Sequence, residues 1–136
     1  PGEMTKPSDI VEVLPASWED SGTRDADRVA GFVTDDCFYH NVPIDPVTGR
    51  ARIRDYIKPG LDGAEAVEFA ILSVAEADGG AVLTERLDRF RVNGTWVELP
   101  VMGIFELEAG KIAKWRDYFD LAQFNRMMGE AVGKPA

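Results

Sequence analysis

Two aspartates and one arginine stand out because their predicted strand positions place charged groups on faces that are otherwise apolar. Arg86 and Asp88 share one face of the segment 81–92, and Asp117 lies on the aromatic face of the segment 111–118. A carboxylate buried without a partner costs several kcal/mol or more. Because a guanidinium stays protonated and can hydrogen-bond two carboxylates at once, we expect Arg86 to lie between Asp88 and Asp117 in one cavity.

A second pair of polar residues, Tyr39 and Asn41, shares one face of the predicted strand 37–42. A phenol and an amide together supply the donors and acceptors that can hold a water molecule. Two carboxyl groups in different surroundings titrate at different pH values, so one can be a general acid while the other is a general base. These polar residues therefore predict acid–base chemistry on an uncharged substrate, with either aspartate as the proton donor.

Each of these features also has a purely structural explanation. An Arg-x-Asp pair on a strand is commonly a solvated ion pair, and Asp117 could cap a turn or the helix expected near Asp120. Tyr39 and Asn41 could be an ordinary strand aromatic and a strand-end polar residue. These explanations weaken in combination, because three separate strands would each carry a misplaced polar group without a reason.

The composition is that of a globular domain. Of 136 residues, 45% are hydrophobic and 29% are charged, which is typical of folded chains. A net charge of −9, from 15 Lys and Arg against 24 Asp and Glu, disfavours binding to nucleic acid or to an anionic membrane. A single cysteine, Cys37, and a single histidine, His40, exclude an internal disulfide and a Cys/His zinc site.

We expect one domain over residues 1–136, with residues 1–8 and 129–136 flexible because they are polar or contain Pro and Gly. No apolar run approaches the roughly 20 residues of a membrane helix, and the N-terminus lacks the apolar core of a secretory signal. Together with the single cysteine, these features predict a cytoplasmic protein.

The hydrophobic pattern changes from a helical period to a period of two near Val67. Asn93-Gly94 predicts a tight hairpin between two of the strands, and Pro59-Gly60 is expected to end a helix. Helices followed by antiparallel strands predict an α+β domain whose sheet curls over the helices. The predicted helices begin near Ile10 and span 25–32, 50–57 and 120–128; the strands span 37–42, 67–76, 81–92, 95–108 and 111–118, and residues 43–49 form a loop.

A curved sheet with helices on one face leaves a cavity between the two layers, where a binding site is expected. His40 lies on the opposite strand face from Tyr39 and Asn41, so we assign it no catalytic role. The apolar residues predicted to line the pocket are Trp115, Phe90, Phe119 and Ile104.

Several motifs together resemble those of the limonene-1,2-epoxide hydrolase family. The similarity extends from about Phe38 to Phe124 and is weak from about Ile44 to Glu65. The run from Trp115 to Asp120 alone is shared loosely with related cone-shaped folds, whereas Arg-x-Asp combined with Tyr-x-Asn is much more specific. The motifs are Tyr39-His40-Asn41 ahead of a proline, Thr84-Glu85-Arg86-Leu87-Asp88, Gly103-Ile104-Phe105-Glu106-Leu107 with Gly110-Lys111-Ile112, and Lys114 to Leu121.

The resemblance implies a cystatin-like α+β fold, the cone of nuclear-transport-factor-2-like and SnoaL-like proteins, and a homodimer formed through the sheet. It also implies hydrolysis of an apolar epoxide to a vicinal diol in one step, without a cofactor or a metal. By position, Asp117 would be the general base on a water held by Tyr39 and Asn41. Asp88 would be the general acid for the epoxide oxygen, and Arg86 would orient both carboxyls.

Two other functions compete with this one. An isomerase or cyclase of the ketosteroid isomerase or polyketide cyclase type would use one aspartate as a proton shuttle, and an arginine that bridges two acids fits it less well. A non-catalytic ligand-binding module of the same fold would need the polar pocket only for solvation. Because the segment 43–60 does not match the family closely, terpene, lipid and steroid epoxides are all candidate substrates.

Overall fold

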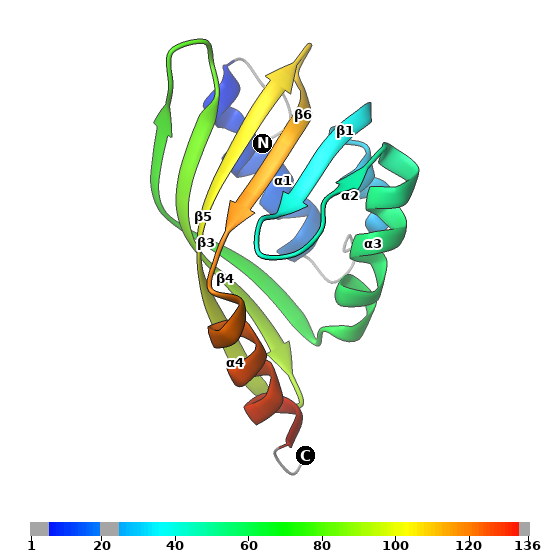
Figure 1. Ribbon diagram of the computed structural model, residues 1–136, viewed down its shortest axis with the longest axis vertical. Coiled ribbons are helices and arrows are strands. Elements are labelled where there is room, and N and C mark those ends of the chain that lie inside the picture. The colour runs from blue at the N-terminus through cyan, green and yellow to red at the C-terminus, as the bar shows by residue number, and fades with distance from the viewer. Residues whose placement is uncertain (1–5, 20–24, 134–136) are drawn as a thin grey trace.

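The computed structural model describes residues 6–19 and 25–133. Helix α3 packs against β1 and α2, and α1 packs against α2 and β3, whereas α4 lies beside β5 and β4 at the other end (Figure 1). In chain order the elements are the 3-10 turn η1 (Pro7–Asp9), α1 (Ile10–Glu19), α2 (Ala26–Ala30), β1 (Val33–Asn41), β2 (Val47–Thr48), α3 (Arg50–Gly63), β3 (Ala66–Glu76), β4 (Val82–Val92), β5 (Thr95–Glu108), β6 (Lys111–Tyr118) and α4 (Leu121–Gly133).

One six-stranded sheet forms the framework, in the order β2-β1-β6-β5-β4-β3. Every neighbouring pair is antiparallel except β1 and β6, which run parallel. This parallel pair places Asn41 beside Asp117 although 76 positions separate them in the chain. The predicted α+β architecture with a mixed, mostly antiparallel sheet is confirmed.

The hydrophobic core forms where the helices meet the sheet. The spacing of buried residues along α3 explains why this segment is helical. Ile53, Ile57 and Leu61 recur every fourth residue along α3 and are all buried, which is the pattern of a helix with one apolar face. No helix of the described segments is long and apolar enough to span a membrane. The buried residues of α3 share this core with Ile10, Leu14, Val29, Val33, Phe105, Ile112 and Trp115.

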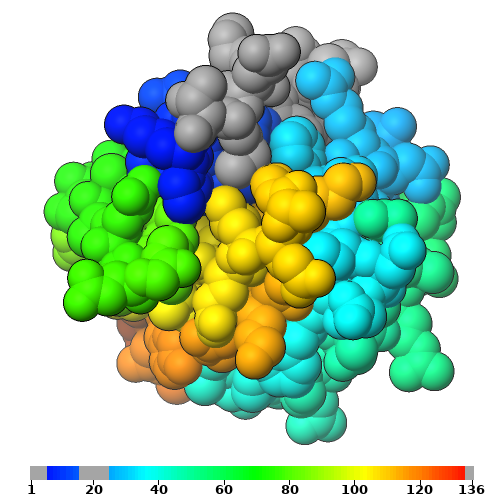
Figure 2. Space-filling model, turned by 90° about the horizontal axis from the view of Figure 1, so that it is seen from above, coloured from blue at the N-terminus to red at the C-terminus, as the bar shows by residue number. Residues whose placement is uncertain are grey.

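The hairpin turns follow the sequence signals. Asn93 and Gly94 both have positive φ, at 52° and 74°, as a tight turn between twisted strands requires. The tight β4–β5 hairpin predicted from Asn93-Gly94 is therefore confirmed. At the opposite end of the sheet, the start of the described chain (blue) lies beside the β3–β4 turn (green) in Figure 2, where the Ser8 amide donates to Glu76 Oε1 at 2.9 Å.

Several predicted element boundaries are wrong. Strand β1 begins at Val33 instead of Cys37. Helix α3 does not stop at Pro59-Gly60 but continues to Gly63. A proline removes one helical N–H donor and its ring clashes with the preceding turn. Here Ile57 and Leu61 are buried on either side of it, so tertiary packing outweighs the local signal. Within the predicted loop 43–49, Val47 and Thr48 form the short strand β2 against β1.

The C-terminal helix is also longer than the predicted segment 120–128. Residues 129–133, expected to be flexible, form its last turn. Asn93 Nδ2 donates to the carbonyl oxygen of Ala131 at 3.2 Å, and Ala131 is buried, so this end of α4 is held to the β4–β5 turn. Residues 1–5 and 134–136, which were also predicted to be flexible, lie outside the described residues.

Candidate active site

The guanidinium of Arg86 is the centre of a buried charge cluster between β4 and β6. Its Nε and Nη2 atoms donate to Asp88 Oδ1 and Oδ2 at 2.8 and 2.9 Å, and Nη2 also lies 3.1 Å from Asp117 Oδ2. Its Nη1 atom donates to Thr84 Oγ1 at 3.0 Å. Arg86 is only 1% exposed, which excludes a solvated surface pair. Arg86 therefore lies between the two carboxylates, where strand alternation predicts it.

The strand between the two acids carries a glycine at the level of the cluster. Gly103 pairs with Thr84 on one side and with Asp117 on the other. A Cβ atom at this position would overlap Arg86 Nη1 and lie 2.5 Å from Asp117 Oδ1. The Arg86–Asp117 contact can therefore cross β5 only because residue 103 has no side chain. Sequence analysis treated Gly103 as part of a motif and missed this role.

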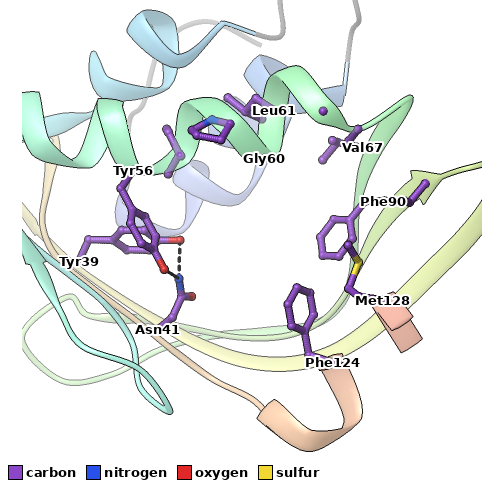
Figure 3. Close-up of a pocket in the computed structure, with 14 residues that line it drawn as sticks. Tyr39, Asn41, Tyr56, Gly60, Leu61, Val67, Phe90, Phe124 and Met128 are labelled. Carbon is purple, nitrogen blue, oxygen red and sulfur yellow. Dashed lines mark hydrogen bonds between the residues drawn. The ribbon is translucent and has the colours of Figure 1, made fainter. Parts of the chain in front are cut away.

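Tyr39 and Asn41 reach the cluster from β1, the strand parallel to β6. Asn41 pairs with Asp117 in the sheet register. Its Nδ2 atom donates to the hydroxyl of Tyr39 at 3.2 Å and to that of Tyr56 at 3.4 Å (Figure 3). With both amide hydrogens directed at phenol oxygens, the amide oxygen of Asn41 can accept a hydrogen bond from a water molecule.

Tyr56 is a polar residue of this site that sequence analysis missed. It lies on α3, and the pattern Ile53-x-x-Tyr56-Ile57 indicates only the apolar side of that helix. In the structure its ring meets that of Tyr39 edge to face, with centroids 5.9 Å apart. Tyr56 is 40% exposed, so no local signal in the sequence distinguishes it from an ordinary helix aromatic.

Burial sets the protonation of the cluster. It raises the pKa of Asp117 to about 6, against the opposing effect of the Arg86 charge and with a further contribution from Asp88. Burial and the charge of Asp117 also raise the pKa of Tyr39, which keeps the phenol protonated. Burial alone would lower the pKa of Arg86, but Asp117 and Asp88 raise it. The site thus combines a permanent cation, a phenol donor and a carboxyl group that titrates near neutrality.

Two other side chains near the cluster bond to backbone. Asp120 Oδ1 accepts a hydrogen bond from the Gln123 amide at 3.0 Å at the start of α4. Asp120 rather than Asp117 therefore caps this helix. His40 Nε2 donates to the carbonyl oxygen of Ile44 at 2.8 Å. Within the described segments, no three His, Cys, Asp or Glu side chains are grouped so that they could hold a metal ion.

Two adjoining cavities lie between the helices and the sheet. The inner cavity has a volume of about 210 Å³, and Asp88 and Asp117 are part of its wall. The outer cavity is larger, about 450 Å³, and its wall within the described residues carries no charged side chain (Figure 3). The residues that line both cavities, and so form the neck between them, are Tyr39, Asn41, Tyr56, Phe90 and Phe124.

The predicted apolar lining agrees with the structure except at one position. Ile104 alternates along β5 with Gly103 and Phe105, which face inward, and it pairs with Leu83 and Arg116 on the opposite face. The prediction for Ile104 is therefore wrong, because β5 carries apolar residues on both faces and this hides its alternation. The predicted residues that do line the inner cavity are Trp115, Phe90 and Phe119.

Comparison with known proteins identifies the family. The sequence profile of the limonene-1,2-epoxide hydrolase catalytic domain matches residues 5–129. The chain belongs to the limonene-1,2-epoxide hydrolase family. It is 37% identical over 97 residues to the epoxide hydrolase EphG of Mycobacterium tuberculosis (strain ATCC 25618 / H37Rv), a match that spans 71% of this chain and 64% of that relative.

Solved structures place this family member in a wider fold group. An LEH-like epoxide hydrolase from M. tuberculosis superimposes with a TM-score of 0.76 at 30% identity, over 94% of this chain and 92% of that chain. A ketosteroid isomerase-like fold from Catenulispora acidiphila (TM-score 0.76, 21% identity, 96% and 100% covered) is also similar. A SnoaL-like protein from Shewanella putrefaciens is similar as well, with a TM-score of 0.76 at 16% identity, over 94% of this chain and 99% of that chain. The last two share the fold alone, and the predicted cone fold is confirmed.

The close approach at Gly103 leads to a stability prediction. Gly103→Ala should lower the free energy of unfolding by at least about 2 kcal/mol, because the new methyl group overpacks a buried ion pair. Urea denaturation followed by circular dichroism measures the change. Gly129→Ala is the matched control: a Cβ there meets nothing within 4 Å, and alanine in a helix should be neutral or stabilising. Equal stability of the two variants would contradict the constraint at residue 103.

Proposed function

We propose that this chain is a cofactor-independent epoxide hydrolase that adds water to an apolar epoxide in one step to give a vicinal diol. The observation that carries the proposal is the buried Asp88–Arg86–Asp117 cluster beside Tyr39 and Asn41 on one cavity. Epoxide opening needs a proton for the oxygen while water attacks a ring carbon. Ring strain lets two acid–base groups achieve this without a covalent intermediate.

The sheet register supports Asp117 as the general base. Asp117 lies next to Asn41 across the β1–β6 pair, so its carboxylate is close to the proposed water-holding groups. Asp88 lies on the other side of Arg86, and its match to the family motif assigns it the role of proton donor. The water oxygen bonds to carbon, the carbon–oxygen bond breaks, Asp88 protonates the leaving oxygen and Asp117 takes a proton from water. Net transfer of one proton from Asp117 to Asp88 restores the starting state.

The second buried carboxylate favours hydrolysis over the proton-shuttle chemistry of an isomerase or cyclase. A shuttle needs one base, whereas this cluster holds two acids on one guanidinium, with both oxygens of Asp88 bonded to Arg86. A pocket that served only to bind an apolar ligand would not need a buried charge cluster, which is costly to desolvate. The likeness to ketosteroid isomerase-like and SnoaL-like structures concerns the fold and carries no activity to this chain.

Isotope labelling tests the direct attack of water. In a single turnover in H₂¹⁸O, one labelled oxygen should appear in the diol, because the nucleophile is water rather than a carboxylate. Mass spectrometry of the diol and of the protein measures where the label goes. A covalent ester intermediate would instead place the label on an aspartate and leave the first diol unlabelled, which would refute the one-step reaction.

The roles of the two acids are tested by amide substitution in the same assay. Asp117→Asn and Asp88→Asn should each lower kcat by at least about 100-fold, since each removes one proton-transfer group. Asp78→Asn, at an exposed turn position, is the matched control and should leave kcat unchanged. A cluster variant with near-normal kcat would refute the role of that aspartate.

The raised pKa of Asp117 predicts the direction of the pH dependence. If Asp117 is the base, kcat/KM should rise with pH through about 6, because only the ionised carboxylate accepts a proton. The contribution of this group to stability has the opposite sign: its folded pKa is raised, so the stability it contributes is lost as pH rises through about 6. The contribution of Asp117 to stability therefore does not explain a rate that rises through this range. A kcat/KM that falls through this range would assign the proton to Asp117 as the donor.

We also propose that the protein is a homodimer formed through the outer face of the sheet. Leu83, Met102 and Tyr118 are exposed large hydrophobic residues, and Met102 pairs with Tyr118 on that face beside Ile104. Exposed apolar clusters of this kind mark interaction surfaces. Analytical ultracentrifugation at micromolar concentration should show a dimer that Met102→Lys converts to a monomer. Val132→Lys, at an exposed residue of α4, is the control, and a monomeric wild type would contradict the proposal.

A further inference from the structure

The reaction proposed above uses the inner cavity and leaves the larger outer cavity without a role. Sites for small organic ligands usually have volumes of about 300–1,000 Å³. The inner cavity, at about 210 Å³, is below that range, and the outer cavity, at about 450 Å³, is within it. A substrate that filled the inner cavity alone would leave an apolar space next to it in contact with water, which is unfavourable.

The last turns of α3 form one wall of the outer cavity. The α3 residues that line it are Tyr56, Ile57, Pro59, Gly60, Leu61 and Gly63, with Ala64 directly after the helix, and none of them is charged. Gly60 and Gly63 are exposed, and a Cβ added at either would meet nothing within 4 Å. The continuation of α3 beyond Pro59 therefore adds an open, uncharged compartment to the site.

The neck between the cavities has two different walls. Tyr39, Asn41 and Tyr56 form a polar wall, linked by hydrogen bonds through the Asn41 amide. Phe90 and Phe124 form the opposite wall, with ring centroids 6.2 Å apart (Figure 3). An apolar chain can pass along the phenylalanine wall while the polar wall remains available to water. The geometry thus separates the reacting end of a ligand from its apolar remainder.

We propose that the outer cavity is a subsite for the apolar body of the substrate, which is an epoxide near one end of an extended hydrocarbon. This inference rests on the proposed epoxide hydrolysis in the inner cavity. The epoxide lies beside Asp88 and Asp117, and the hydrocarbon passes through the neck to contact Val67 and Met128. Contacts that are equally strong in the ground and transition states lower KM without raising kcat, and we expect the contacts in the outer cavity to be of this kind.

The test compares 1,2-epoxydecane with 1,2-epoxybutane. We expect kcat/KM to be at least about tenfold higher for the longer epoxide, mainly through KM, because additional methylene groups are buried. Val67→Phe and Met128→Trp, which fill the outer cavity from β3 and from α4, should lower kcat/KM for 1,2-epoxydecane by at least about fivefold and leave that for 1,2-epoxybutane within about twofold. Gly129→Leu, at an exposed residue of α4 that lines neither cavity, should change neither.

The outcomes separate this inference from the proposed function. Similar kcat/KM values for the two epoxides, or equal losses for both in the filling variants, would overturn the subsite while leaving hydrolysis intact. If neither epoxide is hydrolysed, the proposed function fails, and calorimetry with decane-1,2-diol and butane-1,2-diol then decides about the subsite. The subsite is supported if the longer diol binds more tightly and both Val67→Phe and Met128→Trp abolish the difference. It is overturned if the two diols bind equally, or if both variants keep the tighter binding of the longer diol.

Discussion

A cation that is removed from water is stable inside a protein only when its donors are bonded and its charge is balanced. Arg86 meets both conditions through bonds to Asp88, Asp117 and Thr84. With every group ionised, however, two carboxylates and one guanidinium leave one negative charge in excess. Burial of that excess charge raises the pKa of Asp117 to about 6. The burial that requires Arg86 to be paired therefore also places a titrating carboxyl group beside the cavity.

The cluster depends on how the sheet is connected as much as on the charged residues. The parallel pairing of β1 with β6 brings Asn41 to Asp117 from the opposite end of the chain. The intervening strand β5 lets Arg86 reach Asp117 only because Gly103 has no side chain. Each polar group is thus positioned by backbone hydrogen bonds of the sheet, which is the rigid part of the fold. This is the arrangement that acid–base chemistry requires, since proton transfer is sensitive to small displacements.

The helices have a different relation to the site from that of the sheet. The charged groups all lie on strands, whereas α3 and α4 supply most of the apolar wall of the outer cavity. The local signal of Pro59-Gly60 predicts a helix end, but burial of Leu61 holds the next turn in place. Gly60, Leu61 and Gly63 of these turns line the outer cavity. Changes in these helices can therefore alter the size of the cavity without displacing the charge cluster.

Strand alternation alone places Arg86 and Asp117 on buried faces, because a period of two is a local property of the chain. This pattern, together with the charges, predicts that Arg86 lies between Asp88 and Asp117. The change of hydrophobic period along the chain predicts the α+β class. Three features depend on partners distant in sequence: the close contact at Gly103, the hydrogen bond between Asn41 and Tyr56, and the outward direction of Ile104. Only the tertiary structure decides these, because each results from the register between strands or the placement of a helix on the sheet, and neither is encoded by any local pattern.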